Sequence, residues 1–147
     1  MGALQDRITA DSRTALKSGE KDRLGVLRLL IHGFQQEQMR VGREGLNEDE
    51  ELSILQKAVK MRKEAVALAR EHGREDIEAR ETAEIEVIKA YLPSMFSPEE
   101  LAGKVAELGA EIGYESPKDT GRFMKEWMSR HKGRADGNDV TQALRNL

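Results

Sequence analysis

The chain has 147 residues, of which 38% are hydrophobic, 35% charged and only 4% aromatic, and its formal net charge is −3 at pH 7. This length suits one compact domain, or one domain with a small appended one. The lack of cysteine excludes a disulfide scaffold, an iron–sulfur cluster and a thiolate nucleophile, and the scarcity of aromatic residues disfavours a β-sandwich or barrel.

Periodic apolar residues predict four helices in the first part of the chain. We expect them at about residues 4–18, 22–41, 47–71 and 75–90, with glycine-containing breaks between them. Asn47 is the predicted N-cap of the third helix, because the acidic residues that follow it complement the helix dipole.

The third helix carries two apolar stripes, which predicts contact with more than one neighbour. The two stripes are Leu52, Leu55, Val59, Val66 and Ala69, and Ile54, Ala58, Met61, Ala65 and Leu68. Arg62 lies within this apolar register and needs a carboxylate partner, for which Glu81 and Glu84 of the next helix are candidates. The third helix also carries basic residues that could extend a nucleic-acid surface, but a solvated or ion-paired face is favoured. These residues are Lys57, Lys60, Lys63 and Arg70.

A second domain is predicted after Pro93, because the residue before a proline disfavours helical backbone. Ser97 followed by Pro98 is a helix-start signal, and an apolar stripe continues it to residue 112. Ser116 and Pro117 repeat this signal at the start of a sixth helix. A seventh short helix is expected over residues 138–146.

No segment shows the alternation of a strand, so the predicted fold class is all-α. We expect an N-terminal domain of long antiparallel helices, residues 1–92, and a small C-terminal three-helix domain, residues 93–147. In the sixth helix, Trp127 is expected in the core with Phe123, Met124 and Met128, because helical spacing from Phe123 favours packing over base stacking.

The N-terminal residues lack the apolar core of a signal peptide. The longest apolar run, Leu29-Leu30-Ile31, falls far short of the roughly 20 residues that a membrane span needs. We therefore expect a cytoplasmic protein with no membrane partner.

Motifs for self-contained catalysis are missing from the sequence. The three histidines, His32, His72 and His131, do not have the spacing of a metal site, and no P-loop, nucleophile elbow or dinucleotide fingerprint is present. We accordingly predict no catalytic residue, no cofactor and no metal.

The C-terminal segment, residues 115–147, is locally basic, with seven Lys or Arg and five Asp or Glu. Lys118, Arg122 and Lys125 are spaced four and three apart and are expected to share one helix face. The glycine turns that follow could bring backbone N–H groups close to a phosphate. Two interpretations remain open: a solvated face, which is what charge runs usually form, or an RNA surface that makes phosphate and shape contacts. The candidate RNA-binding residues are Lys118, Arg122, Lys125, Arg130, Lys132, Gly133, Arg134 and Gly137.

Four clusters, in order along the chain, resemble the YqeY family, whose C-terminal half is also the tail of the amidotransferase subunit GatB. They are residues 60–65 (KMRKEA), 73–76 (GRED) with Tyr91-Leu92-Pro93 downstream, 118–124 (KDTGRFM) and 132–137 (KGRADG). Two departures occur: Thr120 replaces a common Met, and Asn138-Asp139 stands where a Lys is common, which removes a positive charge from that turn.

The resemblance implies an all-helical fold and tRNA binding in the service of aminoacylation or transamidation, since a similar domain is also fused to some glutaminyl-tRNA synthetases. We therefore expect a tRNA-binding accessory protein whose partners are tRNA and an aminoacyl-tRNA synthetase or amidotransferase subunit. The alternative is a helical protein–protein adaptor for such an enzyme. Carbon–nitrogen ligase activity with glutamine as amido-N-donor ranks third, because neither a nucleophile nor an ATP site is visible.

Overall fold

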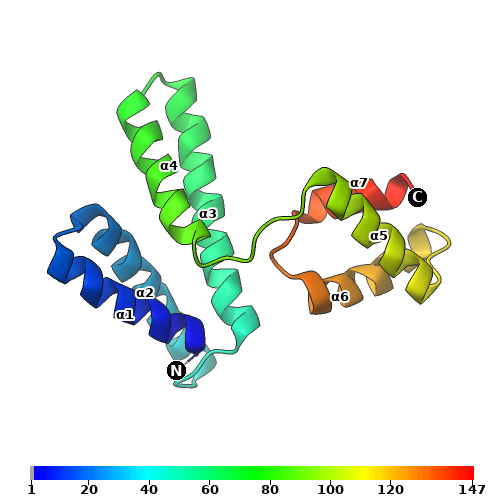
Figure 1. The fold of residues 1–147 in the computed structure, drawn as a ribbon, viewed down its shortest axis with the longest axis horizontal. Coiled ribbons are helices and arrows are strands. Elements are labelled where there is room, and N and C mark those ends of the chain that lie inside the picture. Colours follow the sequence, from blue (N-terminus) through cyan, green and yellow to red (C-terminus); the bar gives the residue numbers. More distant parts are fainter. Residues whose placement is uncertain (1) are drawn as a thin grey trace. The chain divides into compact units, whose positions relative to one another are not determined.

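Helices make up the whole regular structure of residues 2–147, the part of the chain that the computed structural model describes (Figure 1). The elements are α1 (Ala3–Ser18), α2 (Lys21–Val41), α3 (Glu48–Glu71), α4 (Glu75–Lys89), α5 (Pro98–Ile112), the 3-10 helix η1 (Pro117–Asp119), α6 (Thr120–His131) and α7 (Gly137–Arg145). This confirms the predicted all-α class. The chain divides into two compact units, Met1–Leu92 (unit 1) and Pro93–Leu147 (unit 2).

Unit 1 consists of two helical hairpins, α1–α2 and α3–α4, and the two helices of each hairpin pack against each other along their length (Figure 1). Helix α2 also contacts α3 and α4, so the apolar faces of all four helices meet in one core. Fully buried members of that core are Ile8, Leu27, Phe34, Leu55 and Ile88. The predicted start of α3 is confirmed: the Asn47 side chain accepts from the Glu50 N–H, and the Glu50 carboxylate accepts from the Asn47 N–H.

A carboxylate of α3 caps the first turn of α1. Glu51 is 3% exposed, and its Oε2 accepts a hydrogen bond of 2.7 Å from the Gln5 N–H. A Cβ added at Gly2 would lie 2.5 Å from this carboxylate, so only glycine fits there without displacing Glu51. Glu51 is one of the acidic residues that the sequence analysis assigned to the first turn of the third helix, and the structure shows that it also joins α1 to α3.

A second polar junction lies at the end of unit 1. The Tyr91 hydroxyl donates to Asp11 Oδ2 and accepts from Arg23 Nη2 at 3.3 Å. The Arg7 guanidinium lies over the tyrosine ring, 4.8 Å from its centroid. Burial, reinforced by the hydrogen bond to Asp11, raises the pKa of Tyr91 to about 12.

The two apolar stripes of α3 differ in how deeply they are buried. The first stripe is buried, and Ile54 and Ala58 of the second pack against the edge of the core. Met61 and Leu68, at the outer end of the second stripe, remain exposed. The predicted carboxylate partner of Arg62 is confirmed as Glu84, at 3.1 Å.

Unit 2 packs three α-helices around aromatic rings. Phe123 and Trp127 of α6 are buried and stack on each other with their planes 16° apart. The remaining buried members of this core are Leu101, Val105, Leu108, Val140 and Leu144. The core placement of Phe123 and Trp127 is confirmed, but that of Met128 is wrong, because its side chain is 44% exposed.

The two proline-led helix starts of unit 2 differ. Ser97 forms the predicted N-cap, accepting from the Glu100 N–H at 3.1 Å. The predicted start of the sixth helix at Ser116 is wrong, because the chain first forms the 3-10 turn η1 and α6 begins at Thr120. The physical cause is Asp119, whose carboxylate accepts from the Glu115 N–H at 2.9 Å and closes that turn.

None of the helices within residues 2–147 is long and apolar enough to cross a membrane.

Candidate nucleic-acid interface

Helix α6 has one buried side and one open side. Phe123 and Trp127 point into the core of unit 2. Residues on the opposite side recur at intervals of four and three and form one surface, which we call the outer face of α6. The outer face of α6 consists of Gly121, Arg122, Lys125, Met128 and Lys132.

The central cation of this face is Lys125. Its side chain is exposed, and no ion pair to it is found among the described residues. Arg122 lies one turn before it and makes an exposed contact of 3.4 Å with Asp119, of the kind that contributes about 0–1 kcal/mol. Both cations are therefore open to an incoming anion.

Lys118 lies in η1 and not in α6. The prediction that it shares one α-helical face with Arg122 and Lys125 is therefore wrong. Its side chain is nonetheless exposed, just before the first turn of α6. The three cations come from two consecutive elements, and only Arg122 and Lys125 have the spacing of a regular α-helical face.

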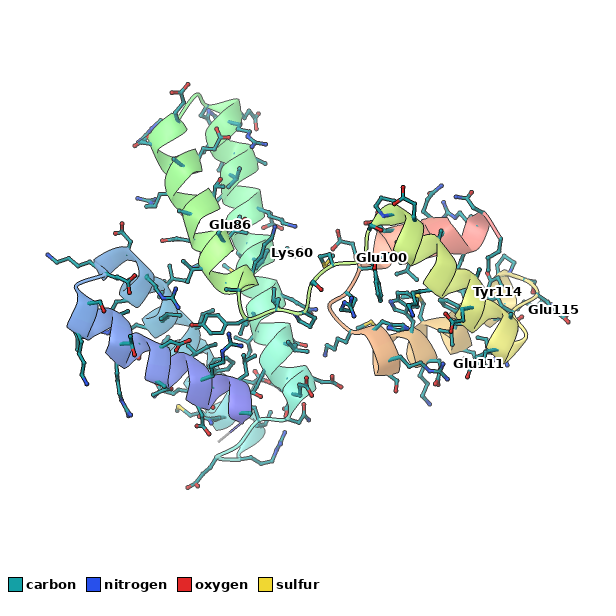
Figure 2. The ribbon with its side chains drawn as sticks, viewed as in Figure 1. Lys60, Glu86, Glu100, Glu111, Tyr114 and Glu115 are labelled. Carbon is teal, nitrogen blue, oxygen red and sulfur yellow. The ribbon has the colours of Figure 1, made fainter. Side chains whose placement is uncertain are left out.

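Arg130 is held by two carboxylates. Its guanidinium donates to Glu111 of α5 at 2.7 and 2.9 Å and to Glu126 of α6 at 2.9 Å, and Figure 2 labels Glu111. These hydrogen bonds raise the pKa of Arg130, and the bond from Arg130 lowers the pKa of Glu111. The cluster carries a net negative charge, so Arg130 joins α5 to α6 and is already neutralised.

Arg134 fastens the start of unit 2 to the turn after α6. Its Nε donates to the Ser94 carbonyl oxygen, and its guanidinium lies 4.1 Å from the centroid of the Phe96 ring. The backbone repeats this link, because the Phe96 N–H donates to the Arg134 carbonyl oxygen at 2.8 Å. Replacing Arg134 would therefore disturb the fold as well as the charge.

The two glycines of the candidate site have different conformations. Gly133 has φ of +79°, in the left-handed region that favours glycine, and thereby reverses the chain after α6. Gly137 is the first residue of α7. Asp136 and Asp139 flank that helix start and bring negative charge to the position where a phosphate would bind.

The end of α6 is only partly accessible. Lys132 is the C-cap residue of α6 and is half-buried. The ring of His131 packs against Trp127 and Phe96, with centroids 4.6 and 5.4 Å away. Burial, with smaller contributions from Lys104 and Arg134, lowers the pKa of His131 below its usual 6.5. His131 therefore carries less positive charge near neutral pH than a solvated histidine would.

Two residues of the outer face were not predicted. Gly121 has open space where a Cβ would stand, and Met128 is the apolar member of the face. The helical period could have identified both, because Gly121, Lys125, Met128 and Lys132 recur at four, three and four residues. Among residues 2–147 there is no group of three or more His, Asp or Glu side chains arranged to hold a metal ion.

A family model described as YqeY-like protein matches residues 5–147. The chain belongs to this family. None of the curated proteins compared with the chain matches it.

The family match extends over both units. The clusters that carried the resemblance lie in different elements of this YqeY-like chain. Residues 60–65 lie within α3, residues 73–76 at the α3–α4 turn, residues 118–124 across η1 and α6, and residues 132–137 in the turn before α7. Three of the four clusters thus include a turn, where glycine and capping residues set the backbone path.

Proposed function

We propose that this YqeY-like protein binds tRNA through the outer face of α6 and serves as an accessory module of aminoacylation or transamidation. The observation that carries the proposal is the contrast among its cations. Arg122 and Lys125 lie together on an open helix face, whereas Arg130 and Arg134 are engaged inside unit 2. Exposed cations at helical spacing suit contact with successive phosphates.

The remaining residues of the face favour close approach of a backbone. Gly121 has no side chain, and a Cβ there would meet nothing within 4 Å. Met128 offers a flexible apolar contact between Lys125 and Lys132. Such a surface recognises phosphate and shape, and specificity for one RNA then comes from the fold of the RNA. A tRNA-handling synthetase or amidotransferase subunit is the corresponding protein partner.

The test is binding of fluorescently labelled bulk tRNA to the full chain across a salt series, with duplex DNA as a comparison ligand. We expect Arg122→Glu/Lys125→Glu to weaken tRNA binding at least about tenfold near physiological salt. The dependence of log affinity on log salt should also become shallower by about one for each phosphate that the variant no longer binds. Arg134 is left unchanged, because its contacts to Ser94 and Phe96 hold unit 2 together.

The matched control is Arg13→Glu/Lys17→Glu on α1. Both side chains are exposed, no ion pair to either is found within residues 2–147, and the change in net charge is identical. We expect this variant to retain most of the affinity and the original salt dependence. Equal weakening by both variants, or no tRNA binding by the wild type near physiological salt, would contradict the proposal.

A further inference from the structure

The outer side of α3 has an exposed apolar surface that the proposed RNA interface does not use. Met61 and Leu68 are 59% and 57% exposed, and their spacing of seven residues places them on the same side of the helix. Ala65 lies between them and is half-buried. Single exposed apolar residues are ordinary, but two in register form the apolar centre of a helix face.

Charged residues are sorted along this face by sign. Lys57 and Lys60 precede Glu64, and Glu71 follows Leu68. All four side chains are exposed, and no ion pair is found for any of them among the described residues. Lys57 makes only the smallest of the contributions that lower the pKa of Glu37 on α2. Figure 2 labels Lys60 on α3. The basic half and the acidic half of the face are therefore both without a partner.

The arrangement is nearly symmetric about Glu64. Lys57 and Glu71 each lie seven residues from it, and Met61 and Leu68 lie three and four residues from it. A second α3 placed antiparallel, with a two-fold axis near Glu64, brings each Lys57 opposite Glu71 and each Met61 opposite Leu68. The two Glu64 side chains then approach each other at the axis, and Lys60, one helical turn before each Glu64, supplies the nearest opposite charge. Such a self-complementary patch has the property that a two-fold interface requires.

We propose that two copies of this chain associate through antiparallel packing of their α3 helices. A nucleic-acid ligand fits this face poorly, because its phosphates would meet Glu64 and Glu71. The segment from Lys57 to Glu71 covers about 22 Å of helix, so the interface lies at the low end of specific interfaces. The dimer is accordingly weak and forms as the protein concentration rises.

Sedimentation velocity of the full chain over about 5 to 500 μM measures this equilibrium. We expect the wild-type mass to rise with concentration from 16.5 kDa toward twice that value. Lys57→Glu and Glu71→Lys should each weaken the dimer about tenfold, because each places two like charges opposite each other. An equimolar mixture of the two variants should regain the wild-type affinity, because every introduced charge then faces an opposite one.

The control is Lys63→Glu, on a different side of α3, where the side chain is also exposed and no ion pair is found in the described chain. We expect it to leave the dimerisation constant unchanged. Far-UV circular dichroism verifies that all variants keep their helices. The proposal is overturned if the wild type sediments as a single chain throughout, if Lys63→Glu weakens the dimer equally, or if the mixture fails to restore it.

Discussion

Different kinds of contact stabilise the interior of each of the two units of this protein. Unit 1 has three buried polar residues, Gln5, Ser12 and Glu51, and its helices are joined by hydrogen bonds at two junctions. In the described part of unit 2 no polar residue is buried, and the stacked rings of Phe123 and Trp127 lie among aliphatic side chains in the core. Arginines of unit 2 make their contacts at its surface.

The difference follows from what each unit must specify. Long helices with apolar stripes can slide along one another, because Leu, Ile and Val contacts carry little directional information. A buried hydrogen bond such as Glu51 to Gln5 is satisfied in only one register. Unit 2 is small, and its aromatic rings prefer defined relative orientations. Ring packing therefore fixes the relative positions of its helices without buried hydrogen bonds. Its surface arginines can then brace the fold, while Lys125 remains available for a ligand.

The largest expected effect concerns the cores. Phe123→Ala removes a buried ring from unit 2 and should cost about 3–5 kcal/mol of its stability. Trp127 is the single tryptophan of the chain and lies in the same core, so its fluorescence reports the unfolding of unit 2 in urea. We expect the midpoint of this transition to fall sharply.

The same measurement on Phe34→Ala supplies the matched control. Phe34 is equally buried in unit 1. If the two cores are separate, this variant loses helical circular dichroism early and leaves the tryptophan transition in place. A tryptophan transition that shifts equally in both variants would show that the units unfold together and would break the comparison.

A smaller effect is expected at the buried carboxylate of unit 1. Glu51→Ala leaves the Gln5 N–H buried without an acceptor, which should cost about 2 kcal/mol. Glu51→Gln keeps an oxygen in place and should lose less than half of that. Hydrogen exchange of the Gln5 amide, measured alongside urea unfolding, distinguishes the two. Equal exchange rates in the wild type and Glu51→Ala would contradict the capping role.

The parts of the fold that the sequence predicted depend on local chemistry. Asn47 and Ser97 were identified as N-caps because a cap involves only residues three positions away. The pairing of Arg62 with Glu84 followed from a charge within an apolar register. The start of the sixth helix was missed because a side chain two residues after the proline, Asp119, closes a competing turn.

The candidate site was harder to predict because its details depend on distant partners. The sequence shows that Arg130 is basic, but Glu111, which neutralises it, lies 19 residues away on another helix. Arg134 likewise contacts Ser94 and Phe96, about 40 residues earlier. Charge counting treats all such cations as equivalent. Only tertiary packing separates the engaged arginines from the open Arg122 and Lys125.

The smallest expected effect is a pH dependence of stability, and it tests the polar junction at Tyr91 that distinguishes unit 1 from unit 2. The pKa of Tyr91 is raised from 10.0 to about 12 in the folded chain, mainly by burial. As the pH rises above 10, the unfolded chain loses this proton first, so the folded state loses stability between pH 10 and 12. Below pH 10 the contribution of Tyr91 is fully present. Tyr91→Phe should remove this component of the alkaline decline, and it should cost about 1.5 kcal/mol at neutral pH through the hydroxyl bonded to Asp11.

Tyr91 and Tyr114 are the two tyrosines of the chain, so Tyr114→Phe leaves Tyr91 as its only phenol. Tyrosinate absorbance of that variant should then titrate with a midpoint near 12 when folded and near 10 in urea. A folded midpoint near 10 would mean that water reaches the hydroxyl and that the junction with Asp11 and Arg23 is open in solution. The polar contacts of Tyr91 would then add little to the stability of unit 1, whose hairpins would depend on apolar packing and on the Glu51–Gln5 hydrogen bond.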